Sequence, residues 1–367
     1  MIKGIDKWLP GYLVSRRRRP GGGRGPRHLM FCVADHFEPF SRSVGPEAAL
    51  DRVARWVHEY PAVFSGIEDA DGRGPQHTFF YPAEEYRPEW ISLLCELVAK
   101  GHGEVEVHLH HRGDTQEGLA KTLLEFKTHL RTDHGLLGED DSGNIRYGFV
   151  HGNWALCNSL PNGDWCGVNE ELTVLQKTGC YADFTFPSAP SPSQPHMVNA
   201  IYRAKDTPCR PRGHDRGGRV RTYSTADRND LMIIEGPLAL DWGRRKLGIL
   251  PRLETGTLDE SNPATPHRLE LWIKQGIGVF GRPEWIFVKV HTHGCLPGNR
   301  RVVLGEPMRS VHEYLANRYN DGRAWKLHYV TAREIYNIIR AAEDGEGDDP
   351  GLYRDFEIKP PPMRWHV

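Results

Sequence analysis

The chain has 367 residues, of which 38% are hydrophobic and 26% are charged, with a formal net charge of −1. These proportions exclude a disordered chain, and no apolar run approaches the ~18 residues of a membrane-spanning helix. The near-zero charge conceals a basic head: residues 1–28 hold eight basic residues and one acidic residue, which leaves the other 339 residues at −8. That acidic bulk argues against a nucleic-acid-binding protein.

The basic head, residues 1–28, combines apolar residues around Trp8 with the run Arg16–Arg19. Two interpretations stay open: a peripheral contact of residues 1–20 with an anionic membrane, or a partly ordered basic tail. The head lacks the features of a secretory signal, and the seven cysteines form neither a CxxC pair nor an even number. We therefore expect a cytoplasmic protein with reduced thiols, with the inner face of the membrane as the place of any contact. The sequence does not indicate an oligomeric state.

Short apolar runs, which predict strands, then alternate with amphipathic stretches, which predict helices. The predicted strands are 28–35, 77–81, 104–110, 147–151, 180–186, 231–235, 285–291 and 327–330. The predicted helices are 46–60, 88–100, 116–134, 168–178, 265–275, 308–319 and 331–343, the last with Thr331 and Glu334 as a capping box. This alternation indicates an α/β fold with a parallel sheet.

A barrel and an open sheet both fit this alternation, but no GxGxxG motif follows the first strand, which weakens a dinucleotide-binding sheet. We predict a (β/α) barrel of seven or eight strands over residues 29–343. Long loops at 188–222 and 243–262 are rich in Pro, Gly and Arg and are expected to cover a site. Residues 344–367 form an acidic, proline-containing tail.

Polar residues gather where the predicted strands end. They are Asp35, His36 and Glu38; His108, His110 and His111; His151, Asn153 and Trp154; Asp183; Glu235, Asp241 and Trp242; and His291 and His293. In a barrel these ends meet at one mouth. Glu104, Glu106, His108 and His110 share one face of their strand, so His108 and His110 can bind one ion. An Asp-His-His set with an open position suits Zn²⁺ or another divalent metal ion.

These segments resemble the polysaccharide deacetylase (NodB-like) family of metal-dependent hydrolases, from about residue 29 to residue 296. Phe31–His36 resembles the family's first motif, a strand that ends in two aspartates, and Gly101–His108 resembles the strand that ends in a metal histidine. Phe184–Pro187 stands where the family has an Arg-x-Pro motif. Asp241-Trp242 and Phe287–His291 resemble the remaining two motifs.

The resemblance implies that Asp35 is the general base, that His36 is a metal ligand, and that His291 is the catalytic acid, paired with Asp241, with His293 as the alternative acid. Three positions depart from the pattern: His36 replaces the second aspartate, Arg112 stands where the second metal histidine is expected, and Thr185 replaces an arginine. The roles of Asp35 and His36 can therefore be exchanged, and either His110 or His111 serves as the second histidine. Asp35 itself remains a candidate ligand.

The leading prediction is a metal-dependent hydrolase of carbohydrate metabolism that removes an acyl group from an N-acylated sugar or polysaccharide by C–N hydrolysis. The alternatives are a glycoside hydrolase that uses Asp35 with Asp183 or Glu235, and a non-catalytic carbohydrate-binding or membrane-associated scaffold. Candidate substrate-binding residues are Tyr81, His151, Asn153, Trp154, Asp183, Pro187, Glu235 and Trp242. Tyr81, Trp154 and Trp242 are placed among them because aromatic rings stack on sugars, although each can equally be a core residue.

Overall fold

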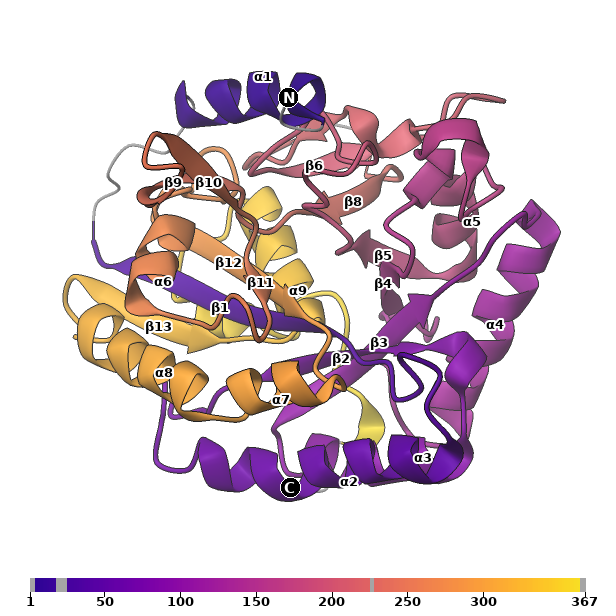
Figure 1. Cartoon of the computed structure of the whole chain (residues 1–367), viewed down its shortest axis with the longest axis horizontal. Coiled ribbons are helices and arrows are strands. Elements are labelled where there is room, and N and C mark those ends of the chain that lie inside the picture. Colours follow the sequence, from indigo (N-terminus) through magenta and orange to yellow (C-terminus); the bar gives the residue numbers. More distant parts are fainter. Residues whose placement is uncertain (1–3, 18–24, 225–227, 364–367) are drawn as a thin grey trace.

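The computed structural model describes residues 4–17, 25–224 and 228–363 (Figure 1). The strands are β1 (Arg27–His36), β2 (His77–Pro82), β3 (Gly103–Leu109), β4 (Tyr147–His151), β5 (Cys180–Asp183), β6 (Ile201–Ala204), β7 (Gly218–Arg219), β8 (Leu231–Ile234), β9 (Ala239–Lys246), β10 (Leu250–Glu254), β11 (Thr257–Leu258), β12 (Trp285–Thr292) and β13 (Trp325–Tyr329). The α-helices are α1 (Ile5–Arg17), α2 (Pro46–Val63), α3 (Pro88–Ala99), α4 (Gln116–Thr132), α5 (Glu171–Thr178), α6 (Pro266–Ile273), α7 (Pro297–Val303), α8 (Glu306–Tyr319) and α9 (Ala332–Asp344).

Eleven strands form one sheet in the order β11-β12-β1-β2-β3-β4-β5-β8-β6-β7, with β13 paired to the first half of β1. Neighbouring strands are parallel except at β6, which runs antiparallel to β8 and β7. The predicted α/β class with a mainly parallel sheet is therefore confirmed. Over the described residues the sheet stays open between β11 and β7, so the closed barrel that we expected is not formed.

The two faces of the sheet bury different side chains because successive residues of a strand point to opposite sides. In β1, Leu29, Phe31 and Val33 join a core with α2, α3, α4, α5, α6 and α8. Met30, Cys32 and Ala34 face the other way and pack with α9. Every residue from Ala332 to Glu343 of α9 is buried. A helix therefore covers the sheet face that lies opposite the main helical layer.

Helices and strands were predictable from the sequence where their pattern of apolar residues was regular. The predicted strands and helices occur within a few residues of their expected bounds, and the capping box of Thr331 and Glu334 is present in α9. The loops expected at 188–222 and 243–262 contain β6, β7, β10 and β11 and the end of β9, so these predictions were wrong in part. Neither α1 nor α7 was predicted as a helix. The short, irregular strands of the loops give too little periodicity to be recognised.

Both ends of the described chain pack onto the fold. Helix α1 lies beside the β9–β10 hairpin and β6 (Figure 1), and it buries Trp8 and Tyr12 against Val198 and Leu238. Near the C-terminus, which we expected to form an acidic tail, Ile358 is buried in the α9 core. The parts of the head and tail at 1–3, 18–24 and 364–367 lie outside the described residues.

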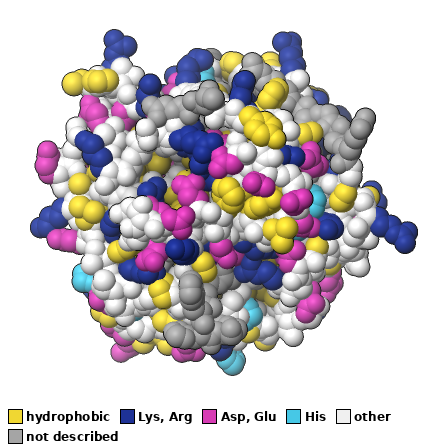
Figure 2. All heavy atoms as spheres, turned by 180° about the vertical axis from the view of Figure 1, so that it is seen from behind, with side chains coloured by type: hydrophobic (Ala, Val, Ile, Leu, Met, Phe, Trp, Pro, Cys, Tyr) yellow, Lys and Arg dark blue, Asp and Glu magenta, His cyan; other side chains and the backbone are white. Residues whose placement is uncertain are grey.

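The surface mixes charges of both signs. Figure 2 shows acidic and basic side chains next to one another over the face seen from behind, in keeping with the near-zero net charge. Among the described residues, no helix is long and apolar enough to cross a membrane.

Candidate metal centre

Three parallel strands bring polar side chains to one place at their C-terminal ends. His36 ends β1 and Glu38 follows two residues later, His108 belongs to β3 and is followed by His110, and His293 comes directly after β12. Strand β1 pairs with β12 and β2, and β2 pairs with β3, so these ends are adjacent. We call His36, Glu38, His108, His110 and His293 the Glu38 group.

Oxygen Oε1 of Glu38 is the centre of this group. It lies 3.3 Å from Nε2 of His108, 3.6 Å from Nε2 of His110 and 3.7 Å from Nε2 of His293. The ring of His36 lies 4.9 Å from that of His108 and stacks 4.6 Å from that of His293. Two sets of three residues, His36-Glu38-His293 and Glu38-His108-His110, have ligand atoms close enough to share one ion.

Two of these rings are oriented by hydrogen bonds that their Nδ1 atoms donate. Nδ1 of His108 donates to the carbonyl oxygen of Val150 (3.0 Å), and Nδ1 of His110 donates to the carboxylate of Glu84 (2.5 Å). A proton on Nδ1 leaves the lone pair of Nε2 for a metal ion, and a carbonyl or carboxylate partner is the usual support of a metal-binding histidine. Both Nε2 atoms point toward Glu38.

Several polar atoms of the group are buried without a hydrogen bond: Oε1 of Glu38, Nε2 of His108 and Nδ1 of His36. Leaving such an atom unsatisfied costs about 1–3 kcal/mol, and more for a charged group. A divalent cation at this place would bind two of these atoms directly and neutralise the carboxylate. The donor set of imidazole nitrogens and one carboxylate oxygen fits Zn²⁺ and similar ions.

Ionisation favours cation binding at three members of the Glu38 group, whereas the hydrogen bond and charge of Glu84 outweigh burial and raise the pKa of His110, so that a cation must displace a proton there. Burial lowers the pKa of His36 well below its usual value, the neighbouring His293 and His108 lower it further, and burial likewise lowers the pKa of His108. Burial acts to raise the pKa of Glu38, but the close approach of His108 and the charge of His293 outweigh it and bring the pKa to about 2. His36 and His108 are therefore neutral and Glu38 is ionised at neutral pH, the forms that bind metals.

A glycine makes room for His110. Gly152 follows β4, and a Cβ atom at this position would lie 2.4 Å from Cδ2 and 2.5 Å from Nε2 of the His110 ring. No other amino acid fits there unless the ring moves. The sequence His151-Gly152-Asn153 thus includes a position that shapes the Glu38 group without contributing a ligand.

Asp35, predicted as base and ligand, is not part of the Glu38 group. It points to the opposite face of β1 from His36, where Oδ2 accepts a hydrogen bond from His77 Nε2 (3.0 Å) and Oδ1 accepts one from the backbone N–H of Gly294 (2.6 Å). The alternation of strand residues separates the two neighbours. Asp35 therefore holds the segment after β12 in place.

Of the two candidates for the second histidine, the structure places His110 in the Glu38 group. His111 faces away and contacts Glu171, as does His151. Neither His111 nor His151 contacts Glu38 within ion-pair distance, and a metal role for His111 at this centre is not supported.

The predicted pair of His291 and Asp241 is not formed. Nε2 of His291 lies 2.8 Å from the hydroxyl of Thr257, whereas Asp241 accepts a hydrogen bond from His267 (2.9 Å). Burial and the charge of Lys289 lower the pKa of His291 well below its usual value, so the expected protonated form is not stabilised here. His293, the alternative acid, lies within the Glu38 group.

Of the predicted substrate-binding residues, Trp154 is the one in contact with the Glu38 group. Its ring stacks 4.9 Å from that of His36 and lies 5.2 Å from that of His291. The others have different surroundings: Tyr81 is a core residue, Asn153 donates to the carbonyl oxygen of His111, Asp183 binds Thr185, Pro187 is buried after a cis peptide bond, Glu235 accepts from Ala200, and Trp242 is 54% exposed on the β9–β10 hairpin.

Sequence reasoning missed the role of two carboxylates. Glu38 was seen at the end of the first strand but was not named as a ligand, although its position two residues after His36 predicts the same side of the chain. Glu84 was not among the predicted site residues. Its contact with His110 joins residues 26 positions apart, and no local pattern shows it.

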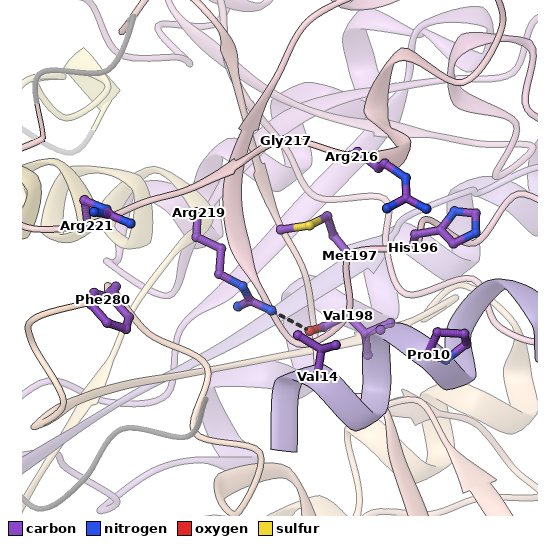
Figure 3. Close-up of a pocket in the computed structure, with 11 residues that line it drawn as sticks. Pro10, Val14, His196, Met197, Val198, Arg216, Gly217, Arg219, Arg221 and Phe280 are labelled. Atoms are coloured by element: carbon purple, nitrogen blue, oxygen red, sulfur yellow. Dashed lines mark hydrogen bonds between the residues drawn. The ribbon is translucent and has the colours of Figure 1, made fainter. Parts of the chain in front are cut away.

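A cavity of about 620 Å³ lies apart from the Glu38 group, between α1 and the segment around β7 (Figure 3). Pro10 and Val14 line one side, and three arginines, Arg216, Arg219 and Arg221, line the other. Arg219 donates to the carbonyl oxygen of Val198 (3.4 Å), and Arg221 lies over the ring of Phe280. The cavity is therefore basic on one side.

No protein-family model matches the chain, and no curated protein matches it. The interpretation of the Glu38 group thus depends on its geometry and chemistry.

Proposed function

We propose that the protein is a metal-dependent hydrolase whose ion is bound within the Glu38 group, by Glu38, His108 and His110. The observation that carries this proposal is the convergence of two oriented imidazoles, His108 and His110, on a buried carboxylate oxygen that has no hydrogen-bond partner. Such an arrangement costs stability in an empty state, and a cation relieves that cost.

The members of the Glu38 group would have different roles. Glu38, His108 and His110 would hold the ion, with His36 and His293 on its other side. Zn²⁺ is the ion proposed, and when bound it would lower the pKa of a water molecule toward ~7 and polarise a substrate carbonyl. Glu84 holds a proton of His110 on Nδ1, so that the lone pair of Nε2 is the one available to the ion.

The proposed reaction is hydrolysis of an acyl C–N bond in an N-acylated sugar or polysaccharide. Trp154 supports a sugar substrate because its half-buried ring borders the metal centre and aromatic faces stack on sugar rings. His293, whose side chain is 30% exposed, can contact a substrate and is the proposed proton donor to the leaving amine. Asp35 has no part in this scheme, since both of its oxygens bind protein groups.

The finer fold assignment belongs to the same proposal. We infer that the open, mostly parallel sheet is a distorted relative of the (β/α) barrel of polysaccharide deacetylases. Motif order along the chain supports this, with the metal-binding residues at the ends of β1 and β3 and further histidines at the end of β12. In this assignment the carboxylate ligand is Glu38 and not the predicted Asp35.

A peripheral contact with an anionic membrane is a second, separate proposal. Trp8 and Tyr12 are buried in the protein and are not available, but Leu13 and Val14 of α1 are 52% and 43% exposed. Arg16 and Arg17 follow on the same helix, and the basic cavity in Figure 3 lies beside it. Exposed apolar residues next to basic groups are typical of membrane-surface helices.

The hydrolase proposal is tested by metal content and turnover together. Purified protein is expected to contain zinc in stoichiometric amount and to release acetate from N-acetylglucosamine oligomers. A chelator should abolish the release and added Zn²⁺ should restore it. His108→Ala should lose the ion and the activity, while the exposed His58→Ala on α2 should keep both.

Two outcomes would contradict the proposal. Cleavage of the oligomers between sugars that persists in chelator would indicate a glycosidase. Wild-type protein that binds no divalent ion in equilibrium dialysis, and hydrolyses no N-acyl sugar, would leave a non-catalytic scaffold as the better description.

A further inference from the structure

A second cluster of residues of metal-ligating type shares no member with the Glu38 group. It consists of His111, which follows β3, His151 at the end of β4, Cys166 in the segment before α5, and Glu171, the first residue of α5. Cys166, Glu171 and His151 are fully buried and His111 is 9% exposed. We call these four residues the Glu171 group.

The side chains of the Glu171 group lie close enough to one another to surround one ion. Oε1 of Glu171 lies 3.1 Å from Nε2 of His111, and Oε2 of Glu171 lies 3.3 Å from Sγ of Cys166. Two ligands of a tetrahedral zinc ion, each about 2.0–2.3 Å from the metal, lie about 3.3–3.8 Å apart. One ligand atom from each residue of the group lies within 4.8 Å of all the others, so little movement is needed to bind an ion.

The sulfur of Cys166 has hydrogen-bond partners on several sides. It accepts hydrogen bonds from the backbone N–H groups of Asn158 (3.4 Å) and Val168 (3.4 Å), and its thiol donates to the carboxylate of Glu171 (3.3 Å). An ion would replace the thiol proton, and the two N–H groups would then remain as partners of the thiolate, the form that binds metals. The turn that places the Val168 N–H needs Gly167, because its φ is +109° and a Cβ atom there would lie 2.4 Å from the backbone nitrogen of Asp114.

Both histidines direct Nε2 toward Glu171. Nε2 of His111 donates a hydrogen bond to Oε1 of Glu171 (3.1 Å), whereas its Nδ1 is buried without a hydrogen-bond partner, 3.3 Å from the carboxylate of Asp114. An ion bound at Nε2 would replace this proton. Nδ1 of His151 instead accepts the backbone N–H of Asn153 (3.2 Å), so the proton of this ring sits on Nε2. That Nε2–H is buried, has no hydrogen-bond acceptor and lies 3.7 Å from Oε1 of Glu171.

We propose that His111, Cys166 and Glu171 bind a second divalent ion of the zinc class, with the Nε2–H of His151 beside the remaining coordination position. One sulfur, one nitrogen and one oxygen ligand favour Zn²⁺ over Mg²⁺ or Ca²⁺. The ion would fasten the segment between β4 and α5 to the end of β3. This segment carries Trp154, which stacks on His36, so the second ion would fix one wall of the Glu38 group.

Cobalt substitution of the full-length protein separates the two sites, because the Glu38 group contains no sulfur. Protein loaded with Co²⁺ is expected to bind two ions per chain and to show thiolate-to-cobalt charge-transfer absorption in the near ultraviolet. His108→Ala should lose one ion and keep this band. Cys166→Ser should lose the band and keep one ion, and the control Cys95→Ser, which removes a buried thiol of α3, should keep the band and both ions.

Two results would contradict the proposed second site. The first is the absence of a charge-transfer band from the cobalt-loaded wild-type protein. This result does not depend on the folding of any variant. The other is a band that survives in Cys166→Ser or in His111→Gln. Loss of an ion in His108→Ala tests the Glu38 group independently, so failure of either site is recognised separately.

Discussion

Alternation along a strand gives the neighbours Asp35 and His36 different chemical environments. His36 lies beside imidazoles and an unsatisfied carboxylate, whereas Asp35 lies under α2, bound to His77 and Gly294. The same rule places His108 and His110 together and directs His111 to the Glu171 group. A one-residue difference in position thus decides which site a side chain joins.

Replacement of Asp35 distinguishes a structural carboxylate from a catalytic one. Asp35→Asn is expected to lower the free energy of unfolding by about 1–3 kcal/mol, because a buried charged acceptor of two hydrogen bonds is lost. The metal content should not change. Urea unfolding and elemental analysis measure both, and Asp51→Asn, an exposed residue of α2, serves as the control. Loss of the ion with unchanged stability would place Asp35 among the ligands.

Gly152 offers a test of His110 that leaves every ligand in the chain. The Cβ of Gly152→Ala would overlap the His110 ring, so the ring must turn away from Glu38. Displacing a support of a metal ligand typically weakens binding by about 10–100-fold, and we expect a loss of this size in a competition assay with a chromophoric chelator.

Gly74→Ala is the matched control for Gly152→Ala, because the nearest atom to its Cβ would be at an ordinary 3.6 Å. Equal metal affinity of the two variants would show that His110 is not a ligand.

The candidate ligands were predictable from the sequence by the rule that alternate residues of a strand face the same side. His36, His108 and His110 were named correctly as neighbours, but Asp35 was included and Glu38 was not, because the family pattern was followed instead of the period of two. The partners Glu84 and Glu171 depend on contacts between residues 26 and 60 positions apart, which no motif in the chain indicates.

At the level of elements, segments with a regular apolar pattern were predicted well and segments without one were not. Helices of 12 or more residues such as α2, α3, α4 and α9 bury a regular apolar face, which the sequence displays. Helix α1 buries only Trp8, Tyr12 and Ser15, so its amphipathic pattern is weak. Its partners Val198 and Leu238 come from distant loops, and tertiary packing therefore decides that this head is helical.

The exposed side of α1 leads to a prediction about membranes. The chain is expected to co-sediment with phosphatidylserine vesicles at low salt, and Leu13→Ser combined with Val14→Ser should weaken binding about tenfold, since two apolar side chains would no longer enter the interface. These point changes are preferable to deletion of residues 1–20, which would expose the core around Val198. Leu124→Ser, an exposed leucine of α4, should bind like wild type. Equal binding of the double variant would dismiss the contact.

At the scale of the molecule, α9 shows why the sequence alone did not distinguish a barrel from an open sheet. Strands and helices follow in the same order along the chain in both folds. The two folds differ in which elements cover each face of the sheet, and here α9 covers one face. Arg333 of α9 pairs with the buried Glu104 of β3, and its neighbour Thr331 binds the same carboxylate. Glu104 and His108 share a strand face, so α9 and the Glu38 group occupy successive parts of one surface.

Buried histidines make the stability of the whole molecule depend on pH. His312 is suited to a test of this dependence because it lies in the core beside Phe31 and Phe64, outside the Glu38 and Glu171 groups. Burial, with a smaller effect of His77, lowers its pKa to about 3. As the pH falls below 6.5, the unfolded chain binds a proton at this residue and the folded chain does not, so the free energy of unfolding decreases. Between pH 7.5 and pH 5 the loss is about 2 kcal/mol at 1.36 kcal/mol per pKa unit.

Replacement by glutamine should remove this part of the pH dependence. We expect the difference in free energy of unfolding between wild type and His312→Gln to shrink by about 2 kcal/mol from pH 7.5 to pH 5, measured by urea unfolding at each pH. Effects of bound metal and of other residues cancel because both proteins share them. The exposed His58→Gln should show a difference from wild type that does not change with pH. A constant difference for His312→Gln as well would mean that this histidine is protonated inside the folded core.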